Sequence, residues 1–172
     1  MKERIGEVEE TIEENSERLE SIEETLEKDK QSQVYFSAYD DEGGEVTGKL
    51  KFPMMVTNLG GAFDGSSGTF TAPVKGVYTF SFSGQQSSKT ATSSDDTMIQ
   101  LFVRKNGATV FIIADDRNTG GEKQSYQNIN SIFSLELNEN DAVHLELANA
   151  DDKLYASGNL RLIFMGQLVV AT

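Results

Sequence analysis

The sequence predicts an all-β sandwich that is preceded by an α-helical coiled coil. Residues 76–82 alternate strictly, so their aromatic side chains share one face of a strand: Tyr78, Phe80 and Phe82. Three rings on one face require a thick apolar layer, which a second sheet packed opposite would supply. Turns rich in Gly and Ser separate three earlier aromatic residues, and each fits a short strand of its own: Phe52, Phe63 and Phe70. We expect these six rings to lie in the core.

Short strands separated by polar turns continue to the C-terminus, and no helix is expected after residue 30. Asn106-Gly107 lies between two alternating stretches and is the strongest hairpin signal in the chain. The other expected strands cover residues 34–39, 98–105, 108–114, 126–137, 142–147, 154–157 and 160–170. The expected polar loops include residues 40–45, 84–97, 115–125 and 149–153.

Residues 4–29 carry the seven-residue hydrophobic repeat of a coiled coil. The a positions are Ile5, Ile12, Leu19 and Leu26, and the d positions are Val8, Asn15 and Ile22. Arg4 and Arg18 fall at g positions, and Glu9 and Glu23 fall at the following e positions, where ion pairs form between helices. Both Arg-to-Glu segments resemble the motif of three-stranded coiled coils. The polar Asn15 either fixes register and strand number at some cost in stability, or forms a ring of three amides around an anion or water.

Eight residues also have the spacing of a family signature, without a gap: Phe52, Asn58, Phe63, Phe70, Gly76, Tyr78, Phe80 and Phe82. This pattern resembles the globular head of complement component 1q, a trimeric jelly roll related to tumour necrosis factor. Residues 34–38, 140–147 and 160–169 are similar to flanking strands of that family. The resemblance implies a two-sheet jelly-roll head at residues 34–172, with a linker at 31–33 and a trimeric coiled-coil stalk at 1–30.

Composition restricts the partners. The chain of 172 residues has a net charge of −13, and residues 1–30 hold twelve acidic against five basic side chains. Such a surface repels phosphate backbones and anionic lipids, so we expect neither nucleic-acid binding nor membrane insertion. No apolar run is long enough to cross a bilayer, and the absence of Cys excludes disulfides and thiol catalysis. We expect no signal peptide, because Met1 leads directly into charged, periodic sequence.

Enzymatic patterns are weak, and we expect a protein that is not an enzyme. His144 is the one histidine, and its alternation with Val143 and Leu145 predicts a surface or interface position on a strand. No nucleophile elbow, Walker motif or dinucleotide fingerprint is present.

Paired acids in the expected loops indicate calcium, because Ca²⁺ takes oxygen ligands without strict geometry. For any single pair, a solvated loop is the simpler interpretation. In the resembling family, calcium can lie at the apex on the threefold axis, which implies Asp115, Asp116 and Gln127 as ligands here. Gln127 stands where many members have Asp. The same resemblance implies partner-binding loops that contain Asp40, Asp41, Asp95, Asp96, Arg117, Asp151 and Asp152.

The resemblance implies a secreted homotrimer that recognises extracellular glycan or protein ligands, in the manner of lectin-like and innate immune proteins. Three weak sites on one trimer gain avidity when the target repeats. One alternative is a matrix or biomineralisation protein whose acids collect calcium. Another is a trimeric signalling ligand for a cell-surface receptor.

Overall fold

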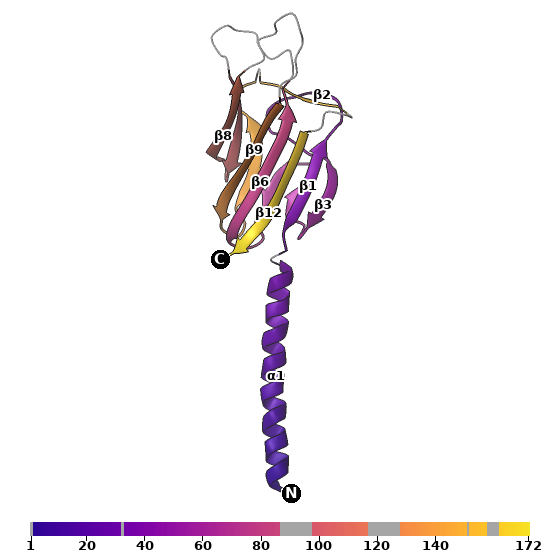
Figure 1. The fold of residues 1–172 in the computed structure, drawn as a ribbon, viewed down its shortest axis with the longest axis vertical. Helices are drawn as coiled ribbons and strands as arrows, with labels where there is room; N and C mark the ends of the chain where they lie inside the picture. Colours follow the sequence, from indigo (N-terminus) through magenta and orange to yellow (C-terminus); the bar gives the residue numbers. More distant parts are fainter. Residues whose placement is uncertain (1, 32, 87–97, 117–127, 151, 158–161) are drawn as a thin grey trace, which may run out of the picture.

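The computed structural model describes residues 2–31, 33–86, 98–116, 128–150, 152–157 and 162–172. One helix, α1 (Lys2–Gln31), leads into a β-structured head. With 30 residues it is roughly 45 Å long, at 1.5 Å of rise per residue. Figure 1 shows it as a stalk that leaves the same end of the head as the C-terminus. The helix continues one residue beyond the expected stalk, into the expected linker 31–33, since no Gly or Pro interrupts it there.

The described part of the head consists of strands, with no helix after α1. The strands are β1 (Tyr35–Asp40), β2 (Gly44–Val46), β3 (Met54–Leu59), β4 (Phe63–Asp64), β5 (Thr69–Thr71), β6 (Gly76–Gln85), β7 (Met98–Lys105), β8 (Ala108–Asp116), β9 (Asn128–Leu137), β10 (Ala142–Leu147), β11 (Leu154–Ala156) and β12 (Leu162–Ala171). The turn between β7 and β8 has φ of 51° at Asn106 and 83° at Gly107, which suits the two residues predicted for a tight hairpin.

Two five-stranded antiparallel sheets pack face to face. The first sheet has the order β3-β1-β12-β6-β9, and the second has the order β4-β5-β10-β7-β8. A small third sheet pairs β11 with β2. Figure 1 views the first sheet from outside, with the second sheet behind it. The predicted sandwich is therefore confirmed.

The space between the sheets holds an aromatic cluster. Its rings include the six expected core residues, all buried: Phe52, Phe63, Phe70, Tyr78, Phe80 and Phe82. Phe36 stacks on Phe63 with ring centroids 4.2 Å apart, and Phe80 meets Phe70 edge to face at 5.2 Å. The Tyr78 hydroxyl donates a hydrogen bond to the Val74 carbonyl at 2.7 Å. The buried hydroxyl therefore keeps a hydrogen-bond partner.

Gly166 fits these rings into the first sheet. It lies on β12 between Phe36 of β1 and Phe80 of β6, in register with both. A Cβ atom at this position would collide with both rings. The absent side chain therefore lets two phenyl groups close over the strand.

Several strand ends differ from the expectation. The segment 40–45 contains the end of β1 and the first two residues of β2, and β6 continues to Gln85. Asp115 and Asp116, expected in a loop, lie in β8 opposite Ile99 and Met98. The polar side chains of these segments led to the prediction of loops. Their backbones instead pair with neighbouring strands, which extends the sheets.

Candidate interaction surfaces

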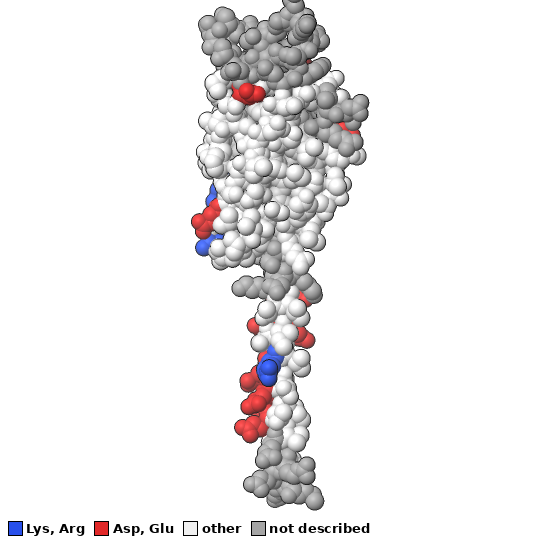
Figure 2. All heavy atoms as spheres, viewed as in Figure 1, with Lys and Arg blue, Asp and Glu red and all other residues white. Residues whose placement is uncertain are grey.

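The outer face of the first sheet is almost free of charge. Away from its margins, the outward side chains are apolar, hydroxylic or amide: Tyr35, Ser37, Thr79, Ser81, Asn130, Ile132, Ser134, Ile163, Met165 and Gln167. Figure 2 shows this face as an uncharged expanse, with charged atoms gathered at its margins. Glu136 and Lys75, 3.9 Å apart, lie where β9 ends and β6 begins. We call this surface the uncharged face.

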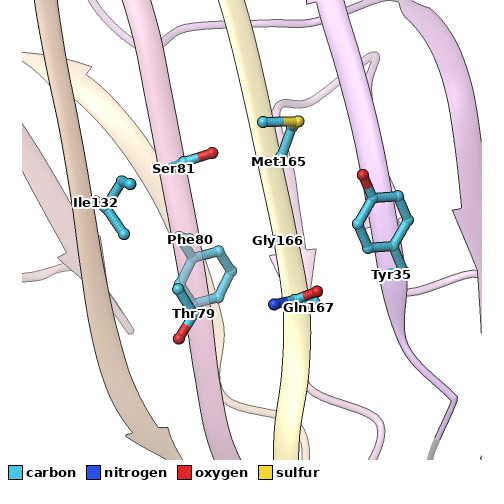
Figure 3. A pocket seen from close by; sticks show the side chains of 8 residues that line it. All are labelled: Tyr35, Thr79, Phe80, Ser81, Ile132, Met165, Gly166 and Gln167. Atoms are coloured by element: carbon cyan, nitrogen blue, oxygen red, sulfur yellow. The ribbon is translucent and has the colours of Figure 1, made fainter.

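The uncharged face has a shallow apolar hollow at its centre. The hollow measures about 230 Å³ and lies around Gly166, between outward side chains of the neighbouring strands. Figure 3 shows Ile132, Met165 and Tyr35 around it. The side chain of Ile132 is 77% exposed, which is unusual for an Ile in a folded protein. A partner that filled the hollow would remove apolar surface from water.

The stalk presents a second apolar surface. Its predicted apolar a and d residues are all more than half exposed: Ile5, Val8, Ile12, Leu19, Ile22 and Leu26. Figure 2 shows acidic side chains along one flank of the helix and an uncharged strip along the other. Arg18, Glu9, Glu23 and Asn15 lie on the described part of the helix, while the side chain of Arg4 lies outside the description. An isolated helix gains little from such a strip, so the pattern indicates packing against another helix.

Comparison with known proteins identifies the head. A sequence model of the C1q domain matches residues 35–169, most of the chain. The chain belongs to the C1q domain family. Among solved structures, the globular domain of the zebrafish complement 1qA protein is 18% identical, with a TM-score of 0.63 over 81% of this chain and 99% of that one. Murine APRIL is 13% identical, with a TM-score of 0.58 over 79% and 99% of the two chains. The Eiger TNF of S. frugiperda is 13% identical, with a TM-score of 0.54 over 81% and 96%.

C1q and TNF-like domains are generally extracellular, non-enzymatic modules that form trimers and bind protein ligands. The predicted membership and the jelly-roll fold are thus confirmed. Within the described ranges, no helix is apolar enough over its length to cross a membrane.

The expected calcium ligands of this C1q domain are only partly described. Asp115 lies near the end of β8 and accepts a hydrogen bond from Gln86 Nε2 at 3.3 Å. The side chain of Asp116 and all of Gln127 lie outside the described residues. No group of three or more His, Cys, Asp or Glu side chains comes together in the part of the chain that the structure describes. The calcium site stays a prediction.

The expected ligand-binding acids separate into three groups. Asp95, Asp96, Arg117 and Asp151 lie outside the described residues. Asp40 is buried at the end of β1 and accepts from the Glu42 backbone N–H at 3.0 Å. Asp152 is fully buried and accepts from Gln100 N at 3.4 Å and Asn149 Nδ2 at 3.2 Å. Asp40 therefore holds its own turn, Asp152 ties its turn to β7, and Asp41, next to Asp40 in the sequence, is half-buried.

The sequence did not predict two of the surfaces. The uncharged face combines residues from β1, β6, β9 and β12, which are distant in sequence, so only the strand order brings them together. The outward face of the second sheet likewise carries His144 on β10, half-buried as its alternation with Val143 and Leu145 indicates. Alternation alone could have separated inward from outward residues, but it could not say which strands are neighbours.

Proposed function

We propose that the chain is a secreted, non-enzymatic recognition protein that works as a homotrimer. The head associates through the uncharged face, and the stalk forms a three-stranded coiled coil below it. Each head then offers one copy of its ligand site, and three copies on a rigid trimer bind a repeated target with avidity.

The uncharged face carries this proposal. A chain with a net charge of −13 would gain solubility from acids on every surface, yet the broad outer face of its first sheet bears almost none. Cores of protein interfaces are depleted in charged residues, and apolar patches left open are an aggregation hazard. Two further copies of the chain would cover the exposed Ile132 and the hollow around Gly166.

The trimer is tested by analytical ultracentrifugation of the full chain at micromolar concentration. The full chain should sediment as a trimer, and removal of residues 1–30 should weaken the trimer without abolishing it. Ile132→Glu should dissociate the shortened chain, because it places a desolvated acid from each copy in the interface. Thr71→Glu adds the same charge to an exposed position of β5 in the other sheet and should leave the trimer intact. A monomeric or dimeric full chain would contradict the proposal.

The recognition role is tested by a screen of glycans and extracellular proteins against the trimer. Binding to immobilised, repeated ligands that survives chelation supports recognition, and the dissociated variant should bind the same surface much more weakly. Saturable uptake of many Ca²⁺ ions per chain would instead indicate a mineral-binding matrix protein. Tight binding to a single receptor ectodomain would indicate a signalling ligand.

A further inference from the structure

A row of polar residues crosses the outward face of the second sheet, with one residue from each strand. The pairings Asp64–Thr69, Thr69–His144, His144–Arg104 and Arg104–Thr109 link β4, β5, β10, β7 and β8 in order. Chain neighbours of the row, such as Phe63, Phe70, Val143 and Val103, are buried, so the row faces away from the core. At about 4.8 Å between strands, it extends over roughly 19 Å. We call these five residues the cross-strand row.

Arg104 is fixed in position next to His144, the middle residue of the row. Its Nε donates to Glu146 Oε2 at 2.8 Å, and its Nη1 donates to Thr109 Oγ1 at 2.6 Å. Its guanidinium carbon also lies 4.8 Å from the centroid of the Phe102 ring. A guanidinium has five N–H donors, so these contacts within the described part of the chain leave three for other acceptors. Because the side chain is already ordered, a ligand would bind it at little cost in conformational entropy.

Lys49 supplies a second cation on the other side of His144. It pairs with Glu146 across the ladder, and its Nζ donates to Thr69 Oγ1 at 2.7 Å. His144 therefore lies between Arg104 and the Lys49–Thr69 pair. At the end of the row, the Asp64 carboxylate accepts from Ser66 N at 3.0 Å and from Ser66 Oγ at 2.7 Å, so it is directed into its own turn. Around His144, the positive charges of Arg104 and Lys49 face the single negative charge of Glu146, which leaves one net positive charge and more donors than acceptors.

We propose that the cross-strand row, together with Lys49, is a binding site for acidic sugars that carry a carboxylate or sulfate group. An oxyanion would accept hydrogen bonds from Arg104 and Lys49, and the Thr hydroxyls would bind sugar hydroxyls. The net positive charge around His144 contrasts with the net charge of −13 of the whole chain. The site rests on the proposed recognition function and names its ligand class. Association through the uncharged face, on the other sheet, leaves all three copies of the row open.

His144 reports on the occupancy of the site. Burial lowers the pKa of His144, and the positive charge of Lys49 and of Arg104 lowers it further, while Glu146 opposes this effect. The imidazole is therefore neutral at pH 7. A bound oxyanion stabilises the protonated form, so it raises the pKa of His144, and affinity rises as the pH falls through the titration range.

The test uses the single histidine of the chain, whose ring C–H signal in proton NMR needs no assignment. The trimer is titrated over pH with sialyllactose, with a heparin disaccharide, with neutral lactose and with a short poly-glutamate peptide. A rise in the pKa of His144 with an acidic sugar, and none with lactose, supports the site, and the two acidic probes distinguish carboxylate from sulfate. No shift with either acidic sugar overturns it. An equal shift with poly-glutamate also overturns it and indicates an acidic protein partner.

Variants separate the site from general electrostatic attraction. Lys49→Gln should weaken acidic-sugar binding roughly tenfold in calorimetry, the loss of one charge-assisted hydrogen bond. Lys75→Gln removes the same charge near the uncharged face and should change binding little. Equal losses in the two variants would overturn the site. Calorimetry with a soluble sugar measures the affinity of each chain separately, so avidity does not affect it. A trimer that binds no acidic sugar would contradict only this site. A monomer that binds acidic sugar would contradict only the proposed trimer.

Discussion

Phe80 lies at the centre of the aromatic core, with ring centroids 5.6 Å from Phe133, 5.9 Å from Phe164 and 5.2 Å from Phe70. It is fully buried. Phe80→Ala should therefore lower the free energy of unfolding by about 3–5 kcal/mol, the usual cost of removing a buried ring. Urea denaturation at fixed protein concentration measures the change. Ser83→Ala, at an exposed position of the same strand, serves as the control and should have little effect. Equal stability of Phe80→Ala and the unmodified chain would show that Phe80 is not a core residue.

Asp141 makes stability depend on acid pH. Its carboxylate binds Lys105 Nζ at 2.9 Å, Asn106 Nδ2 at 2.7 Å and Asn138 N at 2.8 Å. These bonds, that of Lys105 foremost, lower the pKa of Asp141 to about 2. Because the folded pKa is below the unfolded value of about 3.9, the stabilisation is complete above roughly pH 5 and is lost as the pH falls toward 2.

Asp141→Asn should accordingly be less stable than the unmodified chain near pH 6, and the difference should shrink as the pH falls toward 2. Thermal unfolding over this pH range measures it. Asp64, whose pKa is also about 2, leaves the variant with some acid sensitivity. A difference in melting temperature that stays constant over pH would show that the Asp141 carboxylate is not responsible.

At the scale of elements, sequence periodicity was a good guide where one face of a strand is buried. Residues 76–82 form part of β6 with the predicted rings inward, and residues 98–105 match β7. The predicted strand boundaries were wrong where a strand ends in polar residues, as at Asp115 and Asp116. Backbone pairing with β7, not side-chain chemistry, keeps that segment extended. The cross-strand row could not be predicted, since five strands must first be placed in order.

Asn15 is the one polar residue in the apolar strip of the stalk. Three buried amides at one level of a trimer reduce its stability, and they also restrict which registers and strand numbers can form. Asn15→Ile should therefore raise the melting temperature of the helical signal at 222 nm in the full chain. It should also allow species other than trimers when residues 1–31 are studied as a peptide. Glu14→Gln, next to it on the helix, is the control for a polar change outside the strip. A lower melting temperature in Asn15→Ile would show that Asn15 contributes more than register.

At the scale of the whole molecule, negative charge and trimer formation oppose each other. The stalk segment 1–30 has an excess of seven acids, and the remainder has an excess of six. The uncharged face, where we propose that the heads associate, is nearly free of this charge (Figure 2). Asp115 and Asp116 lie at the end of β8 that is remote from the stalk, where three copies around a threefold axis would repel one another if they approach it.

A divalent cation on that axis would relieve the repulsion and take oxygen ligands from three chains at once. Because only the assembled state offers such a site, binding stabilises the trimer by mass action, and millimolar calcium should raise the melting temperature. Asp115→Asn combined with Asp116→Asn should abolish the rise, and Gln127→Ala should reduce it. As a control, Glu136→Gln combined with Glu139→Gln also removes two negative charges, but near the C-terminal end of β9. This variant should keep the calcium-dependent rise in melting temperature. Thermal unfolding that is identical in calcium and in chelator would mean that Asp115 and Asp116 hold no metal, and that cations of the following sequence, Arg117 and Lys123, suffice to balance them.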